Sequence, residues 1–370
     1  MGDHHEILAT EGKTITCKAA VVWAPGEPFV IEEVEVDAPQ WMEVRIKILF
    51  TSICHTDLSA WIGKNEQQRA FPRILGHEAA GVVESVGLGV EGIKAGDHVV
   101  PIFNGECGNC TYCKSEETNL CAEYRVNPLK STMTSDGKTR FFKARHDGED
   151  RMPVYHFLNT STFAEYTVLD SACVVKINPM APLDKMCLFS CGISTGIGAA
   201  WNTADIKEGS TVAIFGLGSL GLAVSFMFSL FFLWHQNSYI LMISDIHAQV
   251  AEGVRLRGAS KIIGVDINPE KFAKGKEMGI IDFINSKECE KPASEVIKEM
   301  TDGGVDYSFE CTGNLHVLRE AFVSTHDGWG MTELKISLEG FITHELPFVE
   351  INKAFQLLKE GKALRCLLRL

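Results

Sequence analysis

The sequence lacks an excess of positive charge. Its 370 residues carry 35 Lys and Arg against 48 Asp and Glu, which gives a formal net charge of −13. Proteins hold nucleic-acid phosphates through clusters of lysine and arginine, and no basic stripe occurs here. The composition therefore argues against nucleic acid as a partner.

The sequence also lacks targeting and anchoring segments. Residues 1–10, MGDHHEILAT, have neither a cationic start nor an apolar core, so we expect no secretory signal. Residue 6 is Glu, which does not fit myristoylation, and Leu367 stands where a prenylated Cys would have to be, so Cys366 is no lipidation site. We expect a cytoplasmic protein without a membrane partner.

Cysteine is abundant, and twelve cysteines without a secretory signal favour metal ligands over disulfides. Four of them lie in CGNCTYCKSEETNLC, at Cys107, Cys110, Cys113 and Cys121. Four thiolates this close together can wrap one tetrahedral zinc ion at about 2.3 Å, and with every position filled the site would be structural. An iron–sulfur cluster is the alternative, although nothing else indicates electron transfer.

A second set of candidate ligands is dispersed along the chain. SICHTD contains Cys54, ILGHE contains His77, and SCGISTG contains Cys191. Each alone is readily explained as a buried core residue. Together, two thiolates and one imidazole would leave a fourth zinc position for substrate, which is the catalytic arrangement.

Polar neighbours of these ligands support that interpretation. Thr56 lies close enough in sequence to Cys54 to offer its hydroxyl to an oxygen on the metal. Asp57 and Glu78 adjoin the candidate ligands and could be the carboxylates that orient them.

The sequence pattern changes along the chain. From about residue 14 to residue 100, short apolar runs bounded by Gly and Pro indicate a β-rich, barrel-like unit. From Gly209 onward, apolar strands alternate with helical patterns, which is typical of βαβ units and a parallel sheet. The tail EINKAFQLLKEG has apolar residues at helical spacing. We predict an α/β protein divided at 1–200, 201–330 and 331–370, with a metal lobe at about 104–122.

A dinucleotide-binding signature follows the strand TVAIF. In GLGSLG, we expect Gly216, Gly218, Leu220 and Gly221 to contact the cofactor, because glycines let the backbone approach a pyrophosphate at a helix N-terminus. Asp266, which ends the strand in KIIGVDIN, would bind the ribose hydroxyls. Its charge would repel a 2′-phosphate and so favours NAD over NADP.

The spacing of this signature is anomalous. The acidic residue is expected about 20 residues after the glycines, but Asp266 lies 45 residues after Gly221. Removing residues 224–249 restores the spacing. The segment could be a membrane segment, an interaction loop or a retained intron. Its apolar runs fall short of the about 20 residues that a span needs. Val224–Ser225 and Gln249 can be encoded by GTAAGT and CAG, the ends of an intron, so we favour the intron hypothesis.

These motifs, taken in order, resemble the zinc-dependent medium-chain alcohol dehydrogenases, near their plant alcohol-dehydrogenase-like branch. The matching stretches are SICHTDLSAW, ILGHEAAGVVESVG, CGNCTYCKSEETNLC, SCGISTG, GLGSLG and GVDIN. The resemblance implies a GroES-like catalytic domain, a Rossmann-type domain with a doubly wound parallel sheet, and a homodimer. It also implies NAD and two zinc ions per chain, one catalytic and one structural, and hydride transfer from a primary or secondary alcohol.

The resemblance assigns further roles to single residues. Thr56 would relay the proton of the alcohol, and Ser59 stands where many members carry a relay histidine, so the proton would leave through water or another group. The remaining assignments are the cofactor contacts His55, Thr195 and Arg365 and the pocket walls Trp61 and Phe103.

The resemblance also indicates a missing segment. After STHDGWG the family continues with two more strands and about fifty residues, whereas here MTELKISLEG follows at once. A skipped exon or a faulty gene model would explain the gap, which would expose a sheet edge and remove the edge used for dimer pairing.

Two other functions stay open. One is a glutathione-adduct formaldehyde dehydrogenase or related reductase of the same fold. The other is a zinc-binding protein with impaired catalysis, because the insertion and the gap both fall in the cofactor domain.

Overall fold

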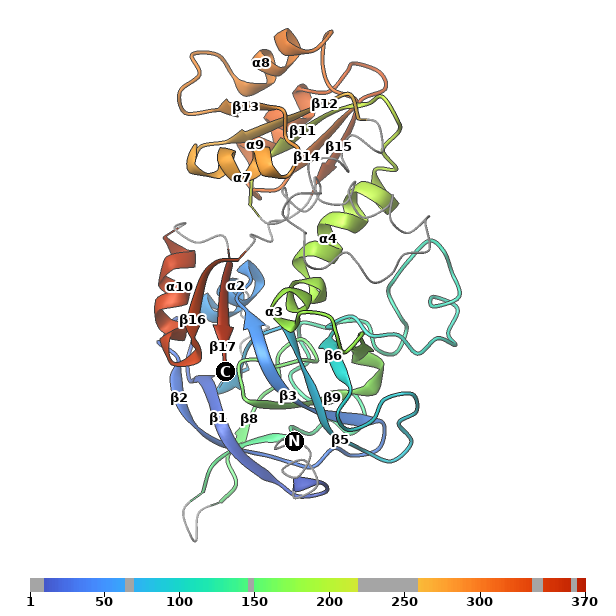
Figure 1. Ribbon diagram of the computed structural model, residues 1–370, viewed down its shortest axis with the longest axis vertical. Helices are drawn as coiled ribbons and strands as arrows, with labels where there is room; N and C mark the ends of the chain where they lie inside the picture. The colour runs from blue at the N-terminus through green and yellow to red at the C-terminus, as the bar shows by residue number, and fades with distance from the viewer. Residues whose placement is uncertain (1–9, 64–69, 146–149, 219–258, 335–341, 361–364) are drawn as a thin grey trace. The chain divides into compact units, whose positions relative to one another are not determined.

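The chain folds into two compact units, Met1–Cys191 with Ile342–Leu370, and Gly192–Phe341 (Figure 1). The computed structural model describes residues 10–63, 70–145, 150–218, 259–334, 342–360 and 365–370. The two units divide at residues 191 and 341, whereas the sequence suggested 200 and 330.

Two β-sheets form the first unit. One has the strand order β4-β1-β2-β7-β8, and the other has the order β10-β6-β5-β3-β17-β16 with β9 also paired to β3. The strands are β1 (Ile15–Val22), β2 (Val30–Val36), β3 (Glu43–Ser52), β4 (Arg73–Ile74), β5 (Glu78–Val86), β6 (His98–Pro101), β7 (Phe141–Lys143), β8 (Pro153–Val154), β9 (Tyr166–Asp170), β10 (Val174–Lys176), β16 (Ile342–Pro347) and β17 (Arg365–Arg369). This arrangement confirms the predicted β-rich unit.

Short helices complete the first unit. They are α2 (His55–Ile62), η2 (Ser171–Cys173), α3 (Leu183–Met186), η3 (Cys187–Ser190), η5 (Phe348–Glu350) and α10 (Ile351–Lys359). The helix α10 buries Ile351, Ala354, Phe355 and Leu358, at the spacing that the sequence pattern predicts.

The C-terminal tail packs into the core of the first unit. The ring of Phe355 lies 4.5 Å from that of Phe29 and 6.0 Å from that of Phe163. Strand β17 runs antiparallel to β3, with Leu367 opposite Ser52. The last residues of the chain therefore complete a sheet that begins some three hundred residues earlier.

The second unit is a parallel sheet with the order β13-β12-β11-β14-β15. Its strands are β11 (Thr211–Phe215), β12 (Lys261–Asp266), β13 (Asp282–Asn285), β14 (Tyr307–Glu310) and β15 (Met331–Leu334). Its helices are α4 (Gly192–Gly198), the π-helical turn η4 (Ala199–Thr203), α7 (Glu270–Glu277), α8 (Ala293–Met300) and α9 (Leu315–Val323). The order reverses between β11 and β14, which is the switch point of a doubly wound fold and confirms the predicted class.

The sequence that follows STHDGWG supplies a strand beside β14. Residues Met331–Leu334 pair in parallel with β14, with Met331 opposite Tyr307. Within the described ranges, β15 is the last strand on this side of the sheet. Segment 224–249 lies outside the described residues, as do Leu220 and Gly221.

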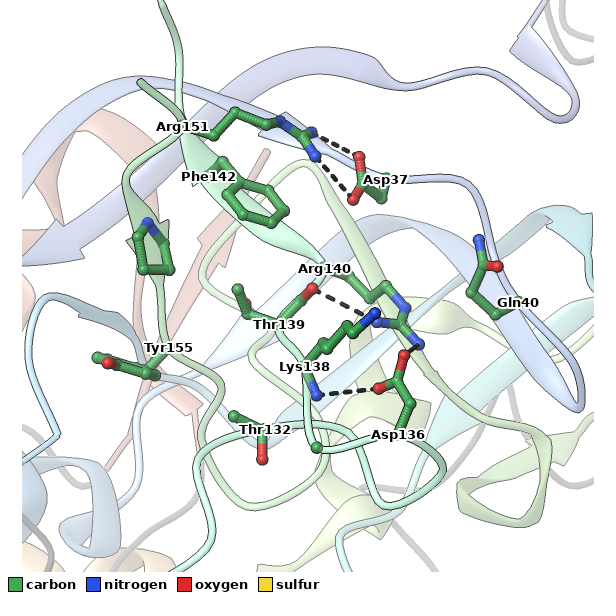
Figure 2. Close-up of a pocket in the computed structure, with 12 residues that line it drawn as sticks. Asp37, Gln40, Thr132, Asp136, Lys138, Thr139, Arg140, Phe142, Arg151 and Tyr155 are labelled. Atoms are coloured by element: carbon green, nitrogen blue, oxygen red, sulfur yellow. Dashed lines mark hydrogen bonds and ion pairs between the residues drawn. The ribbon is translucent and has the colours of Figure 1, made fainter. Parts of the chain in front are cut away.

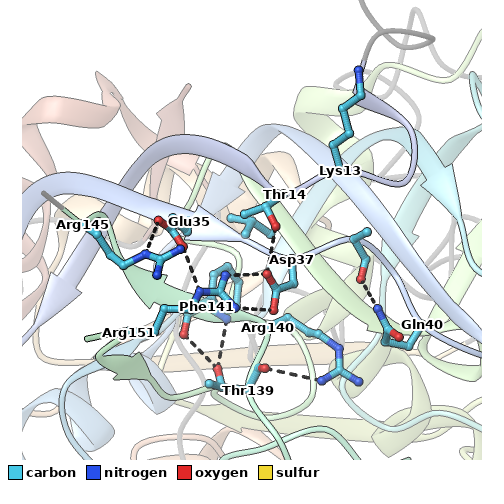
Figure 3. A network of polar contacts seen from close by, with 12 residues as sticks. Lys13, Thr14, Glu35, Asp37, Gln40, Thr139, Arg140, Phe141, Arg145 and Arg151 are labelled. Carbon is cyan, nitrogen blue, oxygen red and sulfur yellow. Dashed lines mark hydrogen bonds and ion pairs between the residues drawn. The ribbon is translucent and has the colours of Figure 1, made fainter. Parts of the chain in front are cut away.

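Ion pairs join the strands of the smaller sheet. Arg151 contacts Asp37 at 2.6 and 3.1 Å and Glu35 at 2.9 Å, and Arg145 also contacts Glu35 (Figure 3). These side chains are partly exposed, so each pair adds little to stability.

A different ion pair is buried. Arg45 is fully buried, and its Nε lies 2.5 Å from Oε2 of Glu84, whose side chain is 2% exposed. The Arg45 guanidinium also donates to the backbone carbonyls of Thr10 and Lys13. This pair fixes β3 to β5 and to the chain before β1.

Replacing Glu84 with Gln should destabilise the first unit by about 3 kcal/mol, because it leaves the buried Arg45 charge without its partner. Urea unfolding measures the change. Burial raises the pKa of Glu84, but hydrogen bonds from Arg45, Ser85 and Thr10 outweigh burial and lower it. The loss should therefore be complete above about pH 4.3, the ordinary Glu pKa, and shrink as the pH falls through the lowered value.

The control for this substitution is Glu345→Gln. Glu345 pairs with Arg369, and both side chains are more than half exposed. This change should cost less than about 1 kcal/mol. Equal losses for the two variants would contradict the role given to the buried pair.

Candidate active site

Cys54, His77 and Cys191 converge in the first unit. Their ligand atoms all lie within 4.8 Å of one another, and all three residues are buried. The pairing of β3 with β5 explains two of the three positions. Ser52 of β3 lies opposite Glu78 of β5, so Cys54, two residues after Ser52, comes close to His77, which directly precedes Glu78.

Cys191 is brought to the same place by Ser190. The Ser190 hydroxyl accepts a hydrogen bond from the Ala79 amide at 3.3 Å and lies 3.2 Å from the Ala79 carbonyl. Ala79 follows His77 by two residues in β5. The segment that carries Cys191 is thus fixed to the strand that begins beside His77.

Asp57 orients the histidine. Its carboxylate lies 3.0 Å from Nδ1 of His77 and accepts the backbone N–H groups of Cys54 and Gly76 at 2.9 and 3.1 Å. The other ring nitrogen, Nε2, is buried and has no hydrogen-bond partner among the described residues. A histidine held at Nδ1 with Nε2 left for a cation is the usual arrangement of a metal ligand.

The charges around His77 also suit a cation. Burial lowers the pKa of His77, but the negative charges of Asp57 and Cys54 outweigh burial and raise it well above 6.5. A metal ion would replace the proton and neutralise the same charges. Two sulfurs and one imidazole nitrogen are ligands that zinc prefers, so the residues present fit this metal.

The predicted polar neighbours lie beside this cluster. Glu78 is fully buried and accepts a short hydrogen bond from the Ser52 hydroxyl. Oγ1 of Thr56, on α2, lies 3.8 Å from Sγ of Cys54. His55 is half-buried, and its Nδ1 has no partner in the part of the chain that the structure describes.

Aromatic rings stand edge-on to His77. The Phe103 ring centroid lies 5.6 Å from that of His77. The Phe157 ring lies 6.1 Å away and is 5% exposed, but no sequence motif marked it. Trp61, the other predicted wall, packs on Phe355 at 5.8 Å and donates to the Glu27 carbonyl.

The four cysteines of the predicted lobe form a second cluster. The ligand atoms of Cys107, Cys110, Cys113 and Cys121 also lie within 4.8 Å of one another. Backbone N–H groups of Ala122 and Cys113 lower the pKa of Cys110 to about 6. Desolvation and the adjoining Cys110 raise that of Cys113 to about 12, because crowded thiols cannot all ionise without a cation. None of the twelve cysteines forms a disulfide.

Three of the predicted dinucleotide residues of the second unit line one pocket. A cavity of about 520 Å³ opens beside Gly216, Gly218 and Asp266. The Asp266 carboxylate ends β12 and accepts the backbone N–H groups of Leu217 and Asn268 at 2.7 and 2.9 Å. It also pairs with Lys271 at 3.1 Å, a contact that the sequence pattern did not indicate.

Gly216 shows why the signature begins with glycine. Its φ is +92°, and a Cβ there would meet the Thr312 side chain at 2.6 Å. The other predicted cofactor residues are less informative. Thr195 lies half-buried on α4, and Arg365 begins β17.

Another hollow, of about 600 Å³, lies in the first unit (Figure 2). Charged groups line it, and four of them form ion pairs with one another: Arg151 contacts Asp37, and Arg140 contacts Asp136 at 3.0 Å (Figure 2). We therefore assign no chemistry to this hollow.

A β-rich unit with a Cys–His–Cys cluster, together with a parallel sheet that carries a dinucleotide signature, defines a metal-dependent dehydrogenase. Comparisons with known proteins agree. Residues 40–179 match the family model "Alcohol dehydrogenase GroES-like domain", and residues 248–361 match "Zinc-binding dehydrogenase". The chain belongs to the zinc-dependent alcohol dehydrogenase family, which is a family of oxidoreductases.

Individual relatives are similar over nearly the whole chain. Alcohol dehydrogenase-like 4 of Arabidopsis thaliana is 53% identical over 98% of this chain and 100% of the relative. Alcohol dehydrogenase-like 3 of the same plant is 54% identical over 98% of both. Among solved structures, an alcohol dehydrogenase zinc-binding domain protein from Burkholderia ambifaria matches with a TM-score of 0.79, 30% identity and 97% and 100% coverage. Benzyl alcohol dehydrogenase from Acinetobacter calcoaceticus matches with a TM-score of 0.77 and 25% identity, over 96% of this chain and 99% of that chain.

The same comparisons bear on the two anomalies in the sequence. The second family match begins at residue 248, beside the end of the 224–249 segment. The match to Alcohol dehydrogenase-like 4 extends over 410 residues, but this chain has 370, so at least 40 aligned positions have no residue here. The relative therefore contains sequence that this chain lacks.

Within the described residues, no helix is both long and apolar enough to cross a bilayer.

Gly216→Ala should destabilise the second unit by about 3 kcal/mol, because it combines backbone strain with a clash against Thr312. Gly209→Ala is the matched control, since its φ is +82° but no atom lies within 4 Å of an added Cβ. The control should cost about 1 kcal/mol. Denaturant unfolding of the second unit measures both, and a Gly216 loss no larger than the Gly209 loss would contradict the close packing.

Proposed function

We propose that this chain is a zinc- and NAD-dependent dehydrogenase that oxidises a primary or secondary alcohol to an aldehyde or ketone. The observation that supports this most strongly is the buried cluster of Cys54, His77 and Cys191. We further propose a cytoplasmic enzyme that acts on small molecules and assembles as a homodimer, with functional domains at 1–200, 201–330 and 331–370.

We propose two zinc ions per chain, one at each cluster. When bound at the Cys–His–Cys cluster, zinc would supply a Lewis acid that lowers the pKa of an alcohol hydroxyl. Asp57 holds Nδ1 of His77, which leaves Nε2 as the nitrogen for the metal. Glu78 is the second buried carboxylate beside the ligands. The four-cysteine lobe would hold the other zinc and stabilise a segment with little core of its own.

The path of the proton follows from the side chains near the cluster. The Thr56 hydroxyl adjoins Cys54 and is suited to pass the proton of an alcohol outward. Ser59 is half-buried at the position of the family's relay histidine. A serine has no group that titrates near neutral pH, so it can pass a proton on but cannot store one. Phe103 and Trp61 are proposed as walls of the substrate pocket.

Most of the residues that we propose for NAD belong to the second unit. Gly216 and Gly218 allow the backbone to approach the pyrophosphate, together with Leu220 and Gly221. The Asp266 carboxylate suits ribose hydroxyls and repels a 2′-phosphate. His55 and Arg365 are proposed as pyrophosphate contacts, and Thr195 as a neighbour of the nicotinamide.

Metal content tests the two clusters separately. The purified chain should contain two zinc ions, and Cys54→Ser and Cys113→Ser should each contain one, because each removes a ligand from a different cluster. Mass spectrometry of the metal measures this. Cys17→Ser is the control, since Cys17 is a buried core residue that belongs to neither cluster, and it should keep both ions. Loss of both ions in Cys54→Ser alone would contradict two independent sites.

Cofactor binding tests the enzyme assignment. A repaired chain lacks residues 224–249 and carries, after Gly330, the two strands and about fifty residues that the family resemblance implies there, taken from Alcohol dehydrogenase-like 4. We expect the repaired chain to bind NADH at least ten-fold more tightly than the unrepaired chain, a difference of about 1.4 kcal/mol. NADH fluorescence measures both affinities.

The repaired chain should then reduce NAD when ethanol or another simple alcohol is added, and Cys54→Ser in the repaired chain should not. Equal NADH affinity before and after repair would refute the inference that the segments damage the cofactor site. A repaired chain that binds NADH and metal but oxidises no alcohol would refute the proposed function.

A further inference from the structure

A loop with an unusual backbone lies beside the Cys–His–Cys cluster. Leu158, Asn159 and Ser161 have φ values of +46°, +60° and +54°. Residues other than glycine rarely adopt this conformation, and it persists only where surrounding contacts fix it. Thr160, Ser161 and Thr162 are fully buried, so a buried set of hydroxyls accompanies the strained backbone.

These hydroxyls and amides bind the backbone that leads into His77. The Ser161 hydroxyl donates to the Ile74 carbonyl at 3.0 Å, and the Phe163 amide donates to the Leu75 carbonyl at 3.0 Å. The Gly76 carbonyl accepts a hydrogen bond from the Thr162 amide at 3.0 Å and a second from the Thr160 hydroxyl at 3.1 Å, which this hydroxyl shares with the Phe157 carbonyl at 3.2 Å. Three consecutive carbonyls before His77 are thereby held by one loop.

The same loop reaches the residue after His77. Oγ1 of Thr162 lies 2.8 Å from Oγ1 of Thr51, which donates to the Glu78 carbonyl at 2.9 Å. The backbone of His77 is therefore fixed on both sides. Gly76 leaves no room for a shift, because a Cβ there would meet Phe163 and Thr162 atoms at 2.5 Å.

The loop also binds the backbone of the two residues whose rings stand against His77. The Phe157 amide donates to the Ser161 hydroxyl at 2.8 Å. The Asn159 side-chain amide donates to the Phe103 carbonyl at 3.2 Å. Since both rings contact the His77 ring at their edges, the loop limits rotation of the imidazole as well as movement of its backbone.

We propose that Thr160 and Ser161 are positioning residues for the metal ligand His77. Their hydroxyls hold the carbonyls of Gly76 and Ile74, so that Nε2 stays at the distance from the two thiols that one ion requires. Asp57 sets the tautomer and ring orientation, whereas this loop sets the position of the backbone. The inference rests on the proposed metal site of the preceding subsection.

The experiment compares metal release from the full chain and from its Thr160→Val variant. Zinc transfer to a chromogenic chelator should show two phases, and the phase that Cys54→Ser abolishes belongs to the Cys–His–Cys cluster. Valine keeps the shape of threonine but leaves the Gly76 carbonyl one donor short. We expect that phase to be about ten-fold faster in Thr160→Val, as for other partners that orient a ligand, while the four-cysteine phase is unchanged.

Two further variants separate positioning from general stability. Thr139→Val removes another buried hydroxyl of the first unit, which donates to the Val154 carbonyl at 2.5 Å, and should leave both phases unchanged. Thr160→Ser restores the hydroxyl and should release metal within two-fold of the unchanged protein. If Thr160→Val does not fold, Ser161→Ala removes the neighbouring donor and should accelerate the same phase.

The outcomes are distinguishable. Equal cluster-phase rates in Thr160→Val and Thr139→Val would overturn the positioning role while leaving the metal site intact. Failure of Thr160→Ser to restore slow release would overturn it as well. A full chain with no phase that depends on Cys54 would instead refute the metal site, and the positioning role with it.

Discussion

The Cys–His–Cys cluster depends on the contact between Asp57 and His77. The carboxylate holds Nδ1 at 3.0 Å and also accepts the amides of Cys54 and Gly76, so one buried side chain joins two of the three segments that form the cluster. A buried carboxylate is costly unless its hydrogen bonds are satisfied, and here the groups that satisfy it are those that carry the ligands. The buried Asp57 carboxylate therefore accounts at once for the charge of the cluster and for the positions of Cys54 and His77.

The remainder of the first unit maintains this contact. Strands β3 and β5 bring Cys54 and His77 together, and Ser190 fixes Cys191 to the same strand. The tail helix and β17 close the core on the other side of β3, so residues near the C-terminus support ligands near the N-terminus. Contacts between segments that are far apart in the sequence can thus hold three ligands close enough to bind one ion.

The features that could be predicted from the sequence are those that depend on neighbouring residues in the chain. The strand TVAIF, the glycine signature and Asp266 are adjacent to turns with strong residue preferences, and the structure has the strand and the carboxylate where expected. The spacing of the four clustered cysteines was enough to predict a metal site. The convergence of Cys54, His77 and Cys191 came from resemblance, since no periodicity links them. Phe157, Thr160 and Lys271 had no signal, because their roles depend on neighbours that are distant in sequence or set by a loop conformation.

X-ray absorption at the zinc edge of the purified chain tests the central claim most directly. Two clusters, one with four sulfurs and one with two sulfurs and a nitrogen, predict about three sulfur ligands per zinc on average, at about 2.3 Å, with a nitrogen or oxygen shell at about 2.0–2.2 Å. A spectrum with four sulfurs per zinc and no nitrogen or oxygen shell would show that only the cysteine lobe holds metal. That result would contradict the convergence of the two thiols and the imidazole on a single ion.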